Sequence, residues 1–156
     1  MNWYKAAQLG DDTAERIRQK AVTTGINVFR GQRPVGARGY ASDPGDFGRG
    51  IYYTTSGHRA QAHGGKGSVS QQVIRFSNPI VLAVEAAYDL AEQYGTVQGG
   101  DERMDGAQRV TNDMIQKGHD SMIVVFGDRG ELEIVDYRPF MGQQESPDEL
   151  VQESDQ

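Results

Sequence analysis

The segment SMIVVFGDRGELEIVDY, residues 121–137, carries the clearest structural signal in the sequence. Its first part, 121–126, is apolar and rich in β-branched residues. Its last part, 131–137, places Leu132, Ile134, Val135 and Tyr137 among three acidic residues, and both parts favour strands. The tetrapeptide GDRG at 127–130 lies between them and is typical of the turn of a β-hairpin. We therefore predict two antiparallel strands here, and the rest of the chain is interpreted outward from them.

Two glutamates open the second predicted strand. Side chains alternate along a strand, so Glu131 and Glu133 point to one face together with Val135 and Tyr137. A pair of carboxylates on a shared face can stabilise a developing positive charge or remove a proton. The structural alternative is an exposed strand at the edge of a sheet, where charged side chains block pairing with another chain.

The remaining chain divides into short elements separated by glycines and prolines. Further strands are predicted where β-branched and aromatic residues cluster, at 27–30, 51–55, 71–76 and 80–82. Helices are predicted from Asp12 to Gly25, from Val84 to Gly95 and from Met104 to Gly118, with a helical turn at 56–62. The glycine-rich residues 31–50 are expected to form a long functional loop. Because strands outnumber helices and do not alternate strictly with them, the predicted class is α+β.

The sequence is long enough for one domain. It has 156 residues, of which 37% are hydrophobic and 24% charged, and this size supports a single core. We expect residues 1–141 to form that domain and the acidic residues 142–156 to be a disordered tail. No apolar run approaches the roughly 20 residues that cross a bilayer, and the first residues lack a signal-peptide pattern. We therefore expect a cytoplasmic protein that does not bind membranes.

Charge and cysteine content argue against several kinds of function. The net charge is −6 and the 16 Lys and Arg are scattered, which disfavours coating of nucleic acid through phosphate contacts. The absence of cysteine excludes disulfides and thiolate metal sites. The three histidines do not share metal-ligand spacing with nearby carboxylates, so no metal is expected.

Two segments add candidate ligand-binding residues. At the end of one predicted strand, Arg30 offers a planar fork suited to phosphate, and Gly31 lets a ligand approach the backbone. In the strand GIYYTTS at 50–56, the adjacent Tyr52 and Tyr53 offer an aromatic platform for a flat ring, with hydroxyl groups nearby. Taken singly, each segment is better explained by structure, as a surface arginine before a turn and as a tyrosine packed in a core.

In this order, the three signals resemble the ADP-ribosyltransferase superfamily, in particular its small toxin-like and phage-encoded members. The family's aromatic-Arg-Gly is matched by FRG at 29–31, its Gly-x-Tyr-aromatic-Ser/Thr strand by 50–56, and its glutamate-led strand by 133–139. The resemblance spans roughly residues 28–140 and implies a split β-sandwich with flanking helices. Arg30 agrees with the Arg-Ser-Glu class and the wording GIYY with the His-Tyr-Glu class, so either Tyr52 or Thr54 fills the central position.

The resemblance implies an enzyme that cleaves NAD⁺ and passes ADP-ribose to an acceptor. Glu133 would hold the 2′-hydroxyl of the ribose and stabilise its oxocarbenium-like transition state. Glu131 matches the second acid of arginine-modifying members, which activates the acceptor. A guanidinium becomes a nucleophile only after it loses a proton, so a protein arginine is the favoured acceptor, ahead of nucleic acid.

The remaining residues would bind NAD⁺ as substrate. By resemblance, Arg30 and Gly31 would contact its phosphates or adenosine ribose, and Tyr52 or Tyr53 would pack on nicotinamide. Thr54 or Ser56 would orient the glutamate. Two alternatives remain open, an NAD glycohydrolase that uses water in the same site and a binding module that has lost catalysis. For a phage-encoded enzyme, the compartment would be the host cytoplasm.

Overall fold

The computed structural model describes residues 11–31, 43–57, 69–127 and 130–142. These residues combine helices and strands, as the predicted α+β class requires. The helices are α1 (Asp11–Val22), α3 (Val84–Tyr94), α4 (Gly100–Gln116) and the short 3₁₀ helix η3 (Arg138–Phe140). The strands are β1 (Ile26–Gly31), β2 (Asp43–Gly45), β3 (Gly48–Thr54), β4 (Val69–Ile74), β5 (Pro79–Ala83), β6 (Ser121–Phe126) and β7 (Glu131–Asp136).

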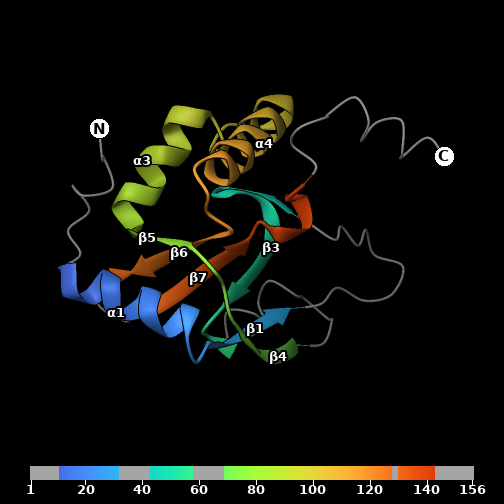
Figure 1. The fold of residues 1–156 in the computed structure, drawn as a ribbon. Coiled ribbons are helices and arrows are strands. Elements are labelled where there is room, and N and C mark those ends of the chain that lie inside the picture. The colour runs from blue at the N-terminus through green and yellow to red at the C-terminus, as the bar shows by residue number, and fades with distance from the viewer. Residues whose placement is uncertain (1–10, 32–42, 58–68, 128–129, 143–156) are drawn as a thin grey trace.

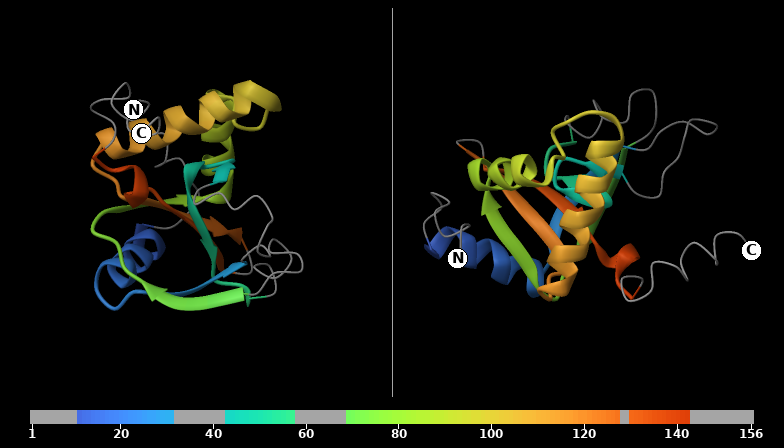
Figure 2. Two further views of the ribbon diagram at one scale, coloured as in Figure 1. Left: turned by 90° about the vertical axis from the view of Figure 1, so that its right-hand side faces the viewer. Right: turned by 90° about the horizontal axis from the view of Figure 1, so that it is seen from above.

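The strands form one mixed sheet with helices on both sides. The order is β4-β1-β3-β7-β6-β5, and β2 pairs with β3 beside this series. The pairing is antiparallel except between β5 and β6, which are parallel and joined through α3 and α4. Figure 1 and Figure 2 show α3 and α4 together on one side of the sheet and α1 on the other.

The sheet is nearly divided between β1 and β3. β1 pairs with β4 along its whole length, from Ile26 to Gly31. In the described part of the chain, β1 and β3 share a single register pair, Phe29 with Thr54. The pair β4-β1 therefore diverges from the series β3-β7-β6-β5, and Figure 1 shows β1 and β4 together at the lower right.

Two hydrophobic cores follow from this arrangement. One lies under α3 and α4 and includes Leu82, Met122 and Val124 of the sheet, all fully buried. The other lies under α1 and joins both parts of the sheet, with Val28 from β1 and Ile134 from β7. The second core holds the diverging β4-β1 pair against the remaining strands because apolar burial is the main force available between them.

Most elements agree with the sequence prediction. The hairpin of β6 and β7, the strands β1, β4 and β5, and the three helices form where expected, within a few residues. Gly95 caps α3, and Gly25 and Gly118 lie three and two residues after the last residues of α1 and α4. Their φ angles of 79°, 88° and 93° lie in the left-handed region that favours glycine. The predicted turn at 56–62 beyond Gly57 and the predicted tail beyond Gly142 lie outside the described residues.

The prediction of one long loop at 31–50 is wrong over its last part. Residues 43–50 form a β-hairpin from β2 and the first half of β3. Two glycines of this hairpin allow other atoms to pack closely against its backbone. A Cβ on Gly45 would lie 2.4 Å from the ring of Tyr52, and one on Gly50 would lie 2.5 Å from the carbonyl oxygen of Asp136. The glycine-rich sequence therefore suggested a loop, whereas the structure requires residues without a side chain at Gly45 and Gly50 of the hairpin.

Another close contact, between α3 and α4, also depends on a glycine. A Cβ on Gly106 of α4 would lie 2.2 Å from the carbonyl oxygen of Tyr94 at the end of α3. The same carbonyl accepts a hydrogen bond of 3.0 Å from Arg109 Nη2, and the Tyr94 hydroxyl bonds to Asp113. The end of α3 is thus clamped on α4 by contacts that tolerate no side chain at position 106.

Gly106→Ala is expected to destabilise the fold, because the added methyl group must push α3 away from α4. Overpacking costs about 1–3 kcal/mol, and a contact of 2.2 Å with a backbone oxygen belongs at the upper end of that range. This exceeds the roughly 1 kcal/mol that alanine gains in helix propensity. The midpoint of thermal unfolding checks the prediction. Gly99→Ala is the control, since a Cβ there meets nothing within 4 Å. Equal midpoints for the two variants would contradict the prediction.

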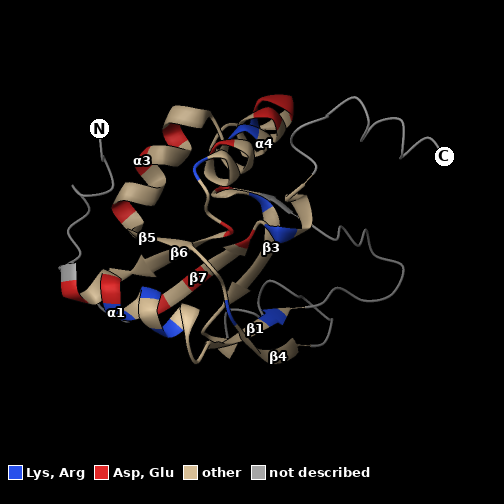
Figure 3. Ribbon diagram, in the orientation of Figure 1, with Lys and Arg blue, Asp and Glu red and all other residues tan. Residues whose placement is uncertain are grey.

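Charge is distributed over many elements of the described chain. Figure 3 shows Lys and Arg on α1, β1, β3 and α4 rather than gathered on one of them. Within the described ranges, no helix is both long and apolar enough to cross a membrane.

Candidate active site

Glu133 lies in the interior of the sheet. β7 pairs with β6 along its whole length and with β3 from Glu133 to Asp136. The Cα partners of Glu133 are Thr54 on β3, 6% exposed, and Val124 on β6, fully buried. Glu133 itself is half-buried. The structural alternative for this residue, a charge that protects a free sheet edge, is therefore wrong.

The second glutamate lies on the same face, nearer the hairpin turn. Glu131 pairs with Phe126 and is also half-buried. Further along this face of β7, Val135 and Tyr137 are fully buried in the core beneath α3 and α4. The predicted alternation is confirmed, and it places both carboxylates where that core ends.

Hydroxyl groups at the end of β3 act on backbone atoms. The Thr55 hydroxyl accepts a hydrogen bond of 2.9 Å from the Leu132 N–H, and the Thr55 N–H donates to the Leu132 carbonyl at 3.0 Å. The Thr54 hydroxyl accepts from the Ser56 N–H at 3.1 Å. These hydrogen bonds fix the end of β3 and the strand that carries Glu133. The orientation of the glutamate by Thr54 or Ser56 stays a prediction. Thr55 was not among the predicted site residues.

Tyr52 shares the face of Glu133, but its hydroxyl has a structural use. It accepts a hydrogen bond from the Phe47 N–H at 3.0 Å and donates to the Gly48 carbonyl at 2.6 Å. Burial raises the pKa of the Tyr52 phenol well above its ordinary value, and the nearby Tyr137 and Glu133 add smaller effects in the same direction. The phenol therefore stays neutral and anchors the β2–β3 turn.

Tyr53 and Arg30 lie on the opposite face. Tyr53 belongs to the core under α1. Burial raises the pKa of its phenol, the negative charge of Asp136 raises this pKa further, and the positive charge of Arg30 lowers it. Arg30 is half-buried, and its Nη1 donates to the Tyr52 carbonyl at 2.9 Å. Gly31, its neighbour, ends β1 opposite Val69 of β4. Arg30 thus bridges β1 and β3 at the point where the two strands diverge.

The structure therefore divides the predicted site residues into two groups. One group shares a face of adjacent strands and consists of Glu131, Glu133, Thr54 and Tyr52. Ser56 lies two residues after the end of β3. Arg30 and Tyr53 lie on the other face. The sequence motifs could not separate the groups because neighbouring residues of one motif point to opposite sides of a strand.

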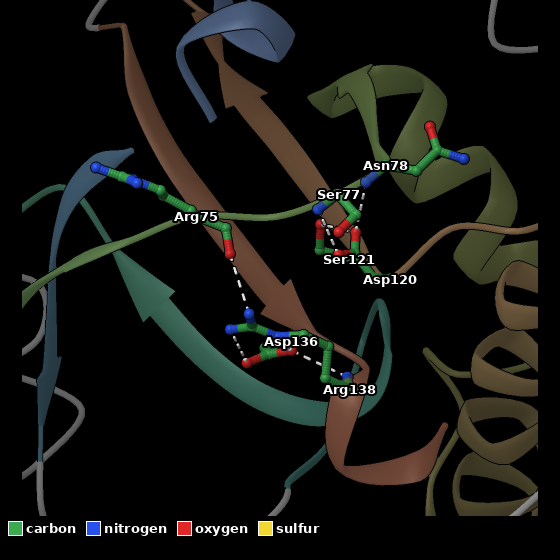
Figure 4. Close-up of polar contacts among 7 residues, drawn as sticks. All are labelled: Arg75, Ser77, Asn78, Asp120, Ser121, Asp136 and Arg138. Carbon is green, nitrogen blue, oxygen red and sulfur yellow. Dashed lines mark hydrogen bonds and ion pairs between the residues drawn. The ribbon is translucent and has the colours of Figure 1, made fainter. Parts of the chain in front are cut away.

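A second polar cluster lies at the other end of β7 and was not predicted. The buried carboxylate of Asp120 accepts hydrogen bonds from the backbone N–H of Ser77 at 2.7 Å and of Asn78 at 3.1 Å. Nearby, Arg138 donates to both carboxylate oxygens of Asp136 at 2.9 Å. Figure 4 shows these contacts joining the segment before β5 to the ends of β6 and β7. These partners satisfy the carboxylates, so the cluster fits a structural role.

Within the described ranges, no group of three or more His, Asp or Glu side chains is arranged to hold a metal ion. Comparisons of the chain with protein-family models, curated proteins and solved structures found no match. The geometry and chemistry of the residues around Glu133 are therefore the basis for assigning a function.

Proposed function

We propose that this protein is a mono-ADP-ribosyltransferase that cleaves NAD⁺ and transfers ADP-ribose to a protein, with arginine as the favoured acceptor. The observation that carries the proposal is the place of Glu133 in the sheet. It is a half-buried carboxylate on an interior strand between buried neighbours, with a second glutamate two residues away on the same face. Two carboxylates held on one face of an interior strand, where the core ends, have the placement that charge stabilisation and proton removal require.

The chemistry requires a carboxylate of this kind. When the bond between nicotinamide and the ribose C1′ breaks, nicotinamide leaves with the bonding electrons and the ribose gains positive charge. A fixed carboxylate stabilises that charge more strongly in the transition state than in bound NAD⁺, and this difference raises the rate. The acceptor guanidinium loses a proton, and its nitrogen then bonds to C1′. In the proposal, Glu133 has the first role and Glu131 removes the proton.

The arrangement of strands supports the finer fold assignment, an ADP-ribosyltransferase-like split β-sandwich. The single register pair between β1 and β3 separates the sheet into two parts, and α1, α3 and α4 flank it. For the central motif position we propose Thr54, which is paired with Glu133, because the Tyr52 hydroxyl is engaged by the β2–β3 turn. Phosphate binding by Arg30 stays a prediction. One nitrogen of its guanidinium, Nη1, already donates a hydrogen bond to the Tyr52 carbonyl.

Incubation with NAD⁺ labelled in its adenylate part, together with a cell lysate, tests the proposal. We expect label on protein, with modified arginines identified by mass spectrometry. Label only in free ADP-ribose would favour the glycohydrolase alternative, and label on nucleic acid would change the acceptor. Unchanged NAD⁺ with every lysate would overturn the enzymatic assignment in favour of a binding module.

Glu131→Gln is expected to lose transfer to arginine while keeping NAD⁺ hydrolysis. Water needs less help than a guanidinium, whose pKa lies above about 12 and which must lose a proton before it attacks. Transfer to a small guanidine compound and release of nicotinamide measure the two activities separately. General-base removal reduces rates by about 100- to 10,000-fold, so transfer is expected to fall within this range. If both activities persist, Glu131 is not the base.

A further inference from the structure

The ladder between β3 and β7 continues one residue beyond the end of β3, with an exchange of acceptors. Thr55 donates its N–H to the Leu132 carbonyl at 3.0 Å, as in a regular antiparallel pair. In the regular pattern the Thr55 carbonyl would accept the Leu132 N–H in return. Here the Thr55 hydroxyl accepts it, at 2.9 Å. A side chain thus completes the last rung of the ladder.

This exchange lets the chain turn away from the sheet without releasing β7. The Thr55 carbonyl is not needed for pairing, and the Thr54 hydroxyl accepts the Ser56 N–H at the same bend. Leu132 is meanwhile held at both its N–H and its carbonyl. The Thr55 hydroxyl allows the chain to turn away and still accepts the Leu132 N–H. Valine has the same shape but offers no acceptor for that N–H.

The residue held in this way lies between the two glutamates. Fixing the peptide groups on both sides of Leu132 fixes the Cα atoms of Glu131 and Glu133, from which the carboxylates project to one face. We propose that Thr55 is a positioning residue that sets the two carboxylates by holding the backbone between them. This inference rests on the proposed function, because that function supplies the reaction in which the two carboxylates act.

The kinetic test compares Thr55→Val and Thr55→Ala with Thr55→Ser. Both hydroxyl-free variants leave the half-buried Leu132 N–H without its acceptor, whereas serine restores it. Misplaced catalytic groups cost up to about 100-fold in rate, so we expect kcat for NAD⁺ cleavage to fall about 10- to 100-fold. The KM for NAD⁺ is expected to change less than about threefold, since binding is shared with other residues. Thr55→Ser is expected to retain wild-type kcat.

Ser121→Ala is the matched control for general loss of stability. Its buried hydroxyl donates to Asp120 at 3.2 Å, at the end of the β6–β7 ladder remote from the glutamates. It should lower the melting temperature without lowering kcat. A kcat loss in Ser121→Ala equal to that in Thr55→Val, or a Thr55→Ser variant as slow as the valine variant, would overturn the positioning role.

Amide hydrogen exchange separates this proposal from the function on which it rests. The Leu132 amide is expected to lose protection in Thr55→Val and Thr55→Ala and to keep it in Thr55→Ser. Full protection in the hydroxyl-free variants overturns the proposal, whatever their activity. If the wild type does not cleave NAD⁺, the proposed function fails, and loss of protection would still support the hold of Thr55 on β7.

Discussion

Glu133→Gln is expected to abolish NAD⁺ cleavage while NAD⁺ binding survives. Glutamine keeps the size and shape of the side chain and removes its charge. The lost interaction is one that strengthens as the ribose becomes positive, so kcat should fall while the dissociation constant changes little. Loss of a single electrostatic contact of this kind costs at least about 100-fold in kcat. Nicotinamide release measures turnover, and calorimetric titration with NAD⁺ measures binding.

A surface glutamate provides the matched control for this experiment. Glu92 on α3 is exposed, so Glu92→Gln makes the same chemical change away from the sheet. Its turnover should equal that of the wild type. Normal turnover in Glu133→Gln would end the assignment of Glu133. Loss of both binding and turnover, with an unfolded circular dichroism spectrum, would instead give the residue a structural role.

Asp120→Ala is expected to cause the largest loss of stability among single changes to the polar contacts described above. The Asp120 side chain is 4% exposed and accepts hydrogen bonds from the Ser77 and Asn78 N–H groups and from the Ser121 hydroxyl. Alanine leaves two backbone donors without partners, each costing about 1–3 kcal/mol. The expected loss is therefore about 2–6 kcal/mol, a large share of the roughly 5–15 kcal/mol typical of a domain.

Urea denaturation checks this value through the free energy of unfolding. Asp89→Ala is the control, since Asp89 is an exposed acid on α3 and its removal should change stability by less than about 0.5 kcal/mol. A loss below about 1 kcal/mol in Asp120→Ala would mean that water replaces the carboxylate in bonding Ser77 and Asn78.

The parts of the fold that follow local rules were predictable from the sequence. The β6–β7 pair within 121–137 formed as predicted because its strands are set by neighbouring residues, and residues 128–129 of the predicted turn lie outside the described residues. Alternation along a single strand was enough to place Glu131 and Glu133 on the face of Val135 and Tyr137. A left-handed glycine lies within three residues of the end of each predicted helix, for an equally local reason.

The parts that depend on contacts between distant residues were not predictable in this way. Whether Glu133 lies at an edge or inside the sheet depends on β3, whose residues are far away in the chain. The glycines of the β2–β3 hairpin are required by Tyr52 and by the backbone of Asp136, which composition alone does not indicate. The use of the Thr55 hydroxyl as a backbone acceptor likewise becomes visible only when β7 is placed beside it.

The position of β7 also has a consequence for synthesis of the protein. It is the last of the described strands in the chain, yet it lies between β3 and β6. Until β7 has been synthesised, β3 lacks the strand that joins it to β6, so a pairing edge of β3 stays exposed in the nascent chain. Such edges favour aggregation. The sheet closes when Glu131–Asp136 emerges, and the proposed catalytic centre is therefore completed in the same step as the fold.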